Sequence, residues 1–355
     1  MTAEVTSTWF IEEQVGGSNP QGLLCSDGVQ MYGYVYGYYQ TLTISVRAGK
    51  GSWLFYVGIG QRWYMMEKVF QQNLNQKETR LGGPFIIQLL FKEQVDMPAK
   101  ECMLEAMERH IGAADCFSYD EKMTGFASKE HIAEFQDGKI PAQFFVTRCS
   151  DFTGKGFNDF LISQMWDCQN DRDRIFQECK YQILATDMTT DALPIQERAN
   201  LDMDFVEALA ELFPSCEAFY FQNAGKLFLA EDVRNHRITG SDRFIYFGVN
   251  VRFFNIQGTE DMVIDTVGMS TLFLPDLQYH FHDFDPNWIV NHAYHVASYI
   301  LDNNNPIQDG ETVDGIQNGR MSRDLRWKCQ YEQAIIQPPR EVIDIHMGKN
   351  ASGNR

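Results

Sequence analysis

Alternation of apolar and polar residues predicts most of the strands of this chain. The clearest case is residues 277–282, where apolar side chains alternate with polar ones, as in a strand with two different faces. The segment 216–233 carries two apolar runs around a hairpin-like turn at 223–226, and residues 48–51 are predicted to form a hairpin turn between two other strands. Further strand patterns occur at residues 31–46, 52–60, 84–94, 114–121, 122–131, 140–152, 179–188, 244–258, 262–274, 323–336 and 340–348.

Apolar residues at helical spacing predict three helices, at residues 99–112, 196–213 and 286–300, and residues 63–77 also have a more helical pattern. Asp285 is suited to cap the last of them, and Pro286 suits its first position. This helix has a core stripe from Ile289 to Ile300. A second, aromatic stripe lies beside it and consists of Trp288, His292, His295 and Tyr299.

The order of these elements predicts an α+β fold of mainly antiparallel sheets, with helices packed on one face. Two successive segments share the order strand, helix, strand, strand, which suggests an internally duplicated unit. The polar stretch 75–83 ends in two glycines and suggests a domain boundary. We therefore expect a small β-rich N-terminal module at 1–80 and an α+β domain at 81–355. Residues 301–321 are predicted to be a long polar loop.

The composition of the chain argues against some classes of protein function. Apolar residues make up 44% of the 355 residues, enough for a large core, and the net charge is -18. This charge argues against nucleic-acid binding, which requires an excess of Lys and Arg. No apolar run is long enough for a membrane span, and the N-terminus lacks a signal-peptide pattern. The eight scattered cysteines form no C-x-x-C pair, which is typical of a cytoplasmic protein with reduced thiols.

One stretch resembles a known family. The sequence DTVGMSTLFLPDLQYHF, from Asp265 to Phe281, and the helix start that follows it are similar to a bacterial family known as domain of unknown function 4261. The resemblance extends weakly over the last two thirds of the chain. It implies an α+β fold, and related domains imply a place in bacterial toxin–immunity or conflict systems. It implies no catalytic residue.

A histidine cluster is the sharpest candidate for chemistry. His280 and His282 share one face of the predicted strand, and His292 and His295 share one face of the following helix. If the strand and helix pack together, four imidazoles could converge on zinc. The alternative is that these histidines only pack and form hydrogen bonds.

Other catalytic signals are weaker. Asp265, Asp276 and Glu260 could include a proton-transferring pair, but they also suit strand ends and turns of an acidic protein. There is no G-x-S-x-G motif, and Cys149 at a strand end is better explained as a packed thiol than as a nucleophile.

Two functions remain as hypotheses. The first is a non-enzymatic binding protein, such as an immunity-type inhibitor, whose acidic surface engages a basic protein partner. Its expected contact residues are Asp283, Asp285, Trp288 and Tyr299. The second is a zinc-dependent enzyme that uses the four histidines.

Overall fold

A computed structural model describes the protein. It describes residues 21–24, 30–36, 41–48 and 51–58 as strands, and residues 83–135 and 138–353 with their side chains. The chain divides into two compact units, residues 1–68 and 69–355. The predicted boundary near residue 80 lies outside the described residues.

The N-terminal unit contains a four-stranded antiparallel sheet. Its strands pair in chain order, and the predicted hairpin is present, with Ala48 opposite Gly51. The strands are β1 (Gln21–Leu24), β2 (Gln30–Tyr36), β3 (Thr41–Ala48) and β4 (Gly51–Gly58). The helix expected at residues 63–77 falls outside the described residues.

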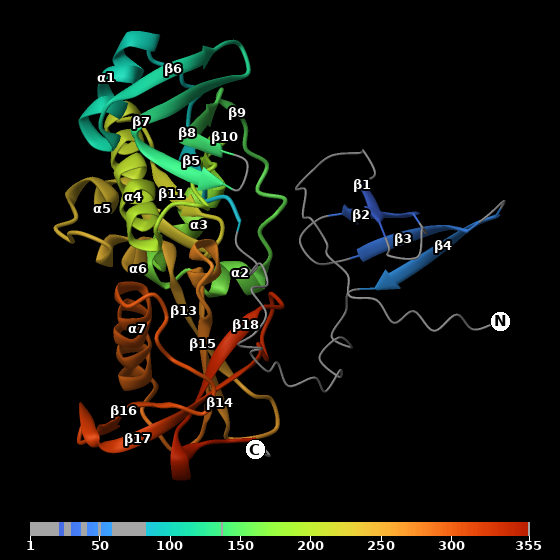
Figure 1. The fold of residues 1–355 in the computed structure, drawn as a ribbon, viewed down its shortest axis with the longest axis vertical. Coiled ribbons are helices and arrows are strands. Elements are labelled where there is room, and N and C mark those ends of the chain that lie inside the picture. Colours follow the sequence, from blue (N-terminus) through green and yellow to red (C-terminus); the bar gives the residue numbers. More distant parts are fainter. Residues whose placement is uncertain are drawn as a thin grey trace. The chain divides into compact units, whose positions relative to one another are not determined.

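The larger unit is built on two sheets (Figure 1). The strand pairs of the eight-stranded sheet are antiparallel. Its order is β12 (Lys226–Leu229), β11 (Ala218–Phe221), β5 (Ile86–Phe91), β10 (Tyr181–Met188), β8 (Gly138–Thr147), β7 (Met123–Phe135) and β6 (Ala114–Tyr119), with β9 (Ser150–Asp151) paired to β10.

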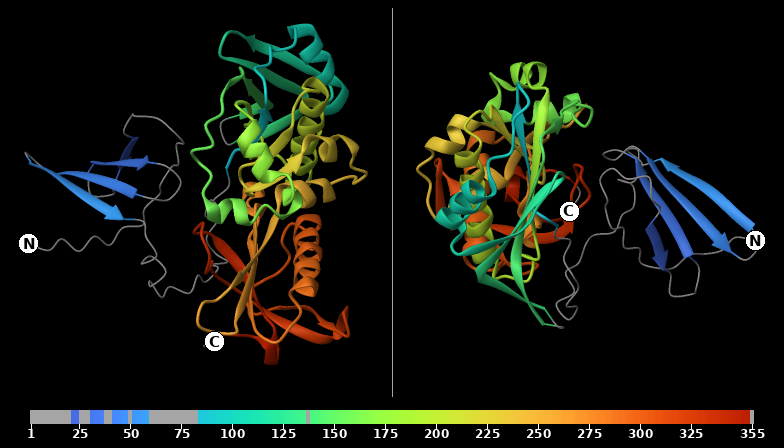
Figure 2. Two further views of the ribbon diagram at one scale, coloured as in Figure 1. Left: turned by 180° about the vertical axis from the view of Figure 1, so that it is seen from behind. Right: turned by 90° about the horizontal axis from the view of Figure 1, so that it is seen from above.

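The two strand-helix-strand-strand segments interlock in this sheet, because the first strand of each segment lies on the side that holds the hairpin of the other segment. Their first strands, β5 and β10, are neighbours at its centre. From β5 the chain passes through α1 (Lys100–Ile111) to the β6–β7 hairpin. From β10 it passes through α4 (Ile195–Leu212) to the β11–β12 hairpin, beyond β5. The two helices pack against each other and cover one face of the sheet (Figure 2).

Short helices add a second apolar layer that the sequence patterns did not indicate. The helices α2 (Asp159–Ser163), η2 (Trp166–Cys168) and α3 (Arg172–Glu178) lie between β9 and β10 in the chain. Ile175 and Cys168 bury against Leu90 and Tyr220, whose side chains point away from α1 and α4. Both faces of this half of the sheet are therefore covered.

The second sheet has six strands, and α7 (Pro286–Asp302) packs against it. The pair β15–β18 is parallel and the others are antiparallel. The order is β13 (Asn250–Asn255), β14 (Met262–Val267), β15 (Asp276–Phe281), β18 (Glu341–His346), β17 (Arg320–Gln333) and β16 (Thr312–Gln317). The remaining helices among the described residues are α5 (Ala230–Asn235), α6 (Asp242–Gly248), η3 (Met269–Leu272) and η4 (Gly348–Asn350).

The α+β prediction is confirmed, but two local predictions were wrong. The predicted strand at 244–258 is helix α6 followed by β13. Phe244, Ile245 and Phe247 are all buried, and a short helix buried on most sides has the same apolar pattern as a buried strand. The predicted loop at 301–321 contains β16, whose alternation is interrupted by a bulge after Asp314.

Arg198 of α4 joins the two sheets. Its guanidinium pairs with Asp187 of β10 at 2.8 Å and donates to the carbonyl oxygen of Thr271 in η3 at 2.7 Å. It also donates to the carbonyl oxygen of Gly83, just before β5. Arg198 and Asp187 are almost completely buried. A buried guanidinium satisfied by a carboxylate and two carbonyls fixes the position of α4 against both sheets.

Asp202 lies one helical turn from Arg198 and is fully buried. Its nearer oxygen is 3.7 Å from Arg198 Nε, and neither carboxylate oxygen has a hydrogen-bond partner in the described structure. Burial, together with the charge of Asp187, raises the pKa of Asp202 well above its ordinary value, although Arg198 acts in the opposite direction. The folded protein therefore keeps the proton on this carboxyl to a higher pH than the unfolded chain does.

We predict that Asp202→Asn flattens the pH dependence of stability. Below about pH 4 the carboxyl is protonated in both the folded and the unfolded chain. As the pH rises further, only the unfolded chain releases this proton, so the wild type loses up to about 1.4 kcal/mol per pH unit until the raised pKa is passed. The midpoint of urea unfolding, measured from pH 4 to 8, should fall less steeply in the variant.

The matched control is Asp324→Asn, which removes an exposed carboxyl from β17. Its pH dependence should match that of the wild type. Equal slopes for wild type and Asp202→Asn would show that Asp202 is ionised in the folded protein.

Candidate functional site

Asp265, the first residue of the family-like stretch, is the centre of a buried ion network. Its carboxylate accepts hydrogen bonds from Arg252 of β13, at 2.9 Å from Nε and 2.6 Å from Nη2. Arg340, just before β18, donates to the same carboxylate at 2.6 Å. All three side chains are buried. The network therefore connects β13 and β14 with the segment that precedes β18.

Asp276 and Gly268 hold the turn between β14 and β15. Asp276 Oδ1 accepts hydrogen bonds from the Thr266 hydroxyl and from the Met269 amide, at 2.9 and 3.2 Å. Gly268 has a φ of 131°, and a Cβ there would lie 2.0 Å from the Gly248 carbonyl oxygen. Only glycine is compatible with this position. Asp276 and Gly268, which belong to the family-like stretch, therefore stabilise the fold of this turn.

The hypothesis of a proton-transferring pair gains no support from this geometry. Arg340 lies between Asp265 and Asp276, with its Nε 3.3 Å from Asp276 Oδ2, and both carboxyls are completely buried. Burial raises the pKa of Asp276 to about 6, against the opposing effect of Arg340. Glu260 is exposed, in the loop between β13 and β14.

The four histidines do not form a common ligand set. His280 Nε2 lies 3.5 Å from an oxygen of Asp261, and His282 Nδ1 lies 2.9 Å from the Ser352 hydroxyl. Within residues 83–135 and 138–353, no group of three or more His, Cys, Asp or Glu side chains is placed to hold a metal ion. The zinc hypothesis therefore has no support in the described part of the chain.

The contacts of His292, in the aromatic stripe of α7, leave it without a free nitrogen for a metal ion. Its Nδ1 lies 2.8 Å from the Tyr279 hydroxyl and its Nε2 lies 2.7 Å from the Asp314 carbonyl oxygen, so both ring nitrogens are occupied. Burial lowers the pKa of His292 to about 4, and the ring is neutral at physiological pH. His295, one turn on, is exposed and lies 2.7 Å from the Asn291 carbonyl oxygen through Nδ1.

The four expected contact residues are exposed. Trp288 and Tyr299 of α7 have exposed fractions of 39% and 49%, although the opposite side of the helix is buried. Asp283 is exposed in the turn before α7. Asp285 is exposed and caps α7 by accepting a hydrogen bond from the Asn287 amide at 2.9 Å. The predicted N-cap is thus present, whereas partner binding remains a prediction.

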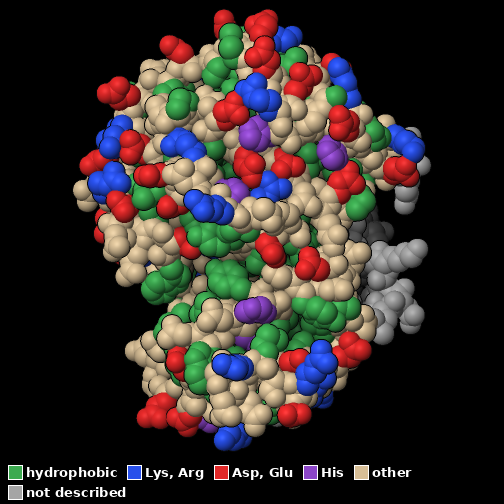
Figure 3. Space-filling model, turned by 90° about the vertical axis from the view of Figure 1, so that its left-hand side faces the viewer, with side chains coloured by type: hydrophobic (Ala, Val, Ile, Leu, Met, Phe, Trp, Pro, Cys, Tyr) green, Lys and Arg blue, Asp and Glu red, His purple; other side chains and the backbone are tan. Residues whose placement is uncertain are grey.

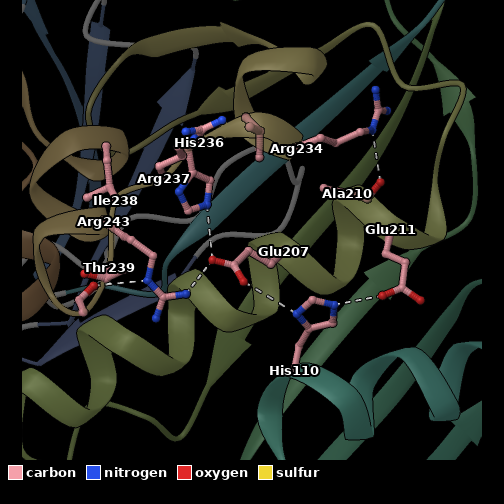
Figure 4. Close-up of a pocket in the computed structure, with 12 residues that line it drawn as sticks. His110, Glu207, Ala210, Glu211, Arg234, His236, Arg237, Ile238, Thr239 and Arg243 are labelled. Atoms are coloured by element: carbon pink, nitrogen blue, oxygen red, sulfur yellow. Dashed lines mark hydrogen bonds and ion pairs between the residues drawn. The ribbon is translucent and has the colours of Figure 1, made fainter.

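A charged pocket that the sequence did not indicate lies between α1, α4 and the α5–α6 segment (Figure 4). Its volume is about 610 Å³. Glu207 of α4 is at its centre, with Arg243 Nη1 and His236 Nε2 at 2.6 and 3.2 Å from one carboxylate oxygen. His110 of α1 bridges Glu207 and Glu211, at 3.6 and 2.9 Å.

The sequence alone does not indicate the pocket, because its residues come from distant parts of the chain. His110 is separated from Glu207 by about a hundred residues, and the two meet only because α1 packs on α4. Glu207 and Glu211 are one turn apart on α4, which was the one local signal of a charged face.

These features define an α+β protein with three mainly antiparallel sheets in its described residues, a buried ion network and a charged pocket. The model of the family described as domain of unknown function (DUF4261) matches residues 265–346, from β14 to β18. The predicted resemblance is confirmed for this part of the chain, and the match does not cover the rest of the last two thirds of the chain. No curated protein and no solved structure matches the chain. No helix in the described residues is long and apolar enough to cross a membrane.

We predict that Asp265→Asn lowers the free energy of unfolding by about 3–5 kcal/mol, because it leaves two buried guanidinium groups with an incomplete set of charged partners. The change is measured by urea unfolding of the full chain. Glu260→Gln is the control, and it should change stability by less than about 0.5 kcal/mol, since Glu260 is exposed. A similar small effect for both variants would contradict the structural importance of the network.

Proposed function

We propose that the protein is a non-enzymatic binding protein that contacts a protein partner through the exposed side of α7. The supporting observation is the exposure of Trp288 and Tyr299 on a helix whose other side is buried in the core. Tyr and Trp are enriched among the residues that dominate binding energy. Hydrophobic side chains also gather over the middle of this side of the unit, which faces the viewer in Figure 3.

Charges of both signs surround Trp288. Asp283 and Asp285 are exposed just before it in the chain. On its other side is the β16–β17 turn, where a Cβ at Gly319 would lie 2.9 Å from Trp288 Cζ2. Residues 318–328 of this hairpin contain four cationic side chains and one acidic one. The proposed contact surface thus has an aromatic centre and a charged rim, the usual anatomy of protein interfaces.

The net charge of -18 favours a partner that is basic overall, because long-range attraction raises the association rate. An immunity-type inhibitor, which masks the active site of a basic enzyme, is the specific form of this proposal. It rests on the family resemblance and on charge. It requires that the partner lose activity in the complex.

The test is capture of partners from the native host with the tagged full chain, followed by calorimetry with the purified partner. We predict that the double variant Trp288→Ala/Tyr299→Ala weakens the complex by at least about 30-fold, because it removes two large contact side chains. Rising salt should slow association. For the inhibitor form, the partner's activity should fall in proportion to the complex formed.

The matched control is Trp166→Ala. Trp166 is 43% exposed, but it belongs to η2 on the other face of the eight-stranded sheet. This variant should bind as the wild type does. If the α7 variant and the control weaken binding equally, the proposed contact surface is wrong. If a captured enzyme keeps its activity in the complex, the inhibitor role is wrong.

A further inference from the structure

The pocket between α1, α4 and the α5–α6 segment has an uneven balance of charge. Both carboxylates that line it are already paired. Glu207 contacts Arg243, His236 and His110, and Glu211 contacts His110 and also Arg109 outside the pocket. No lining carboxylate therefore remains available to neutralise a cationic ligand.

Two of the arginines that line the pocket have no carboxylate partner among the described residues. Arg234 donates only to backbone carbonyl oxygens at the end of α4 and just after it, including those of Ala210 and Phe213, at 3.3 and 3.1 Å. Arg237 is exposed and has no ion pair within the described part of the chain. The uncompensated charge of the pocket is therefore positive, in a protein whose net charge is -18.

The α5–α6 segment adds neutral hydrogen-bond donors. Thr239 is among the residues that line the pocket, and its side chain carries a hydroxyl group. Within residues 83–135 and 138–353, the amides of residues 237–240 donate to no carbonyl or side chain. Gly240 adopts a φ of 63°, which turns the segment back toward α6. An oxyanion could accept hydrogen bonds from such donors together with a guanidinium.

The volume of the pocket and its apolar lining residues indicate a ligand larger than a simple inorganic ion. A volume of about 610 Å³ is within the range of pockets for small organic ligands. Val233, Ile238 and Ala210 supply apolar surface beside the charged groups.

We infer that this pocket binds a small organic anion through its phosphate or carboxylate group, with Arg237 as the main charged contact and Thr239 as a neutral one. Phosphate and carboxylate share the oxyanion chemistry that a guanidinium recognises. The site is separate from the proposed contact surface on α7 and does not depend on that function.

The experiment measures binding of inorganic phosphate and of citrate to the full chain, by calorimetry and by the shift in unfolding temperature. Sodium chloride at the same ionic strength is the reference, because it reproduces general screening without a multivalent oxyanion. We predict that at least one probe binds and raises the unfolding temperature above the reference. Tighter binding of phosphate would indicate a phosphoryl ligand, and tighter binding of citrate would indicate a carboxylic acid.

Arg237→Gln should weaken binding of the preferred probe by about tenfold, as expected for loss of one charge-assisted hydrogen bond. Thr239→Val should weaken it by a smaller factor. Arg323→Gln is the matched control, since it removes the same charge from an exposed position on β17 and should leave binding unchanged. The inference is overturned if neither probe binds more than chloride does, or if Arg237→Gln and Arg323→Gln have equal effects.

Discussion

The contact of Arg198 with Asp187 and with the backbone of η3 is the constraint on which the larger unit depends. It is the point where α4, the eight-stranded sheet and the β14–β15 turn meet. Because the guanidinium is buried, each of its hydrogen bonds has to be satisfied by the protein itself. The positions of the two sheets are thus fixed by directional contacts as well as by apolar packing, which has no preferred direction.

The family-like stretch has a comparable internal constraint. Asp265 is held between Arg252 and Arg340, and Asp276 holds the turn that begins at Gly268. The residues that carry the resemblance therefore have contacts that account for the fold of this region. A function has to be sought on the surface around them, because buried ion pairs in close contact offer no access to a substrate.

The two proposed sites lie on that surface. The α7 surface combines exposed aromatic side chains with a charged rim, which suits a large partner. The pocket beside α4 is concave and has an excess of positive charge, which suits a small anion. Asp302, at the end of α7, accepts a hydrogen bond from Ser241, which directly follows the pocket-lining residues 236–240. The α5–α6 segment therefore lines the pocket and also contacts the end of α7.

The sequence by itself determined the elements whose signals are local. Alternation predicted β15, and Asp285 followed by Pro286 predicted the start of α7. Local pattern failed where burial on most sides hid the helical period of α6, and where a bulge interrupted β16. It also placed four histidines on two faces without deciding whether those faces meet.

Only the tertiary structure decided which side chains come together. His292 binds Tyr279 and the Asp314 carbonyl because α7 packs on the six-stranded sheet, and this leaves no nitrogen for a metal. His110 reaches Glu207 because α1 packs on α4. Such contacts depend on how elements far apart in the chain pack, whereas periodicity reports only how each element alternates along its own length.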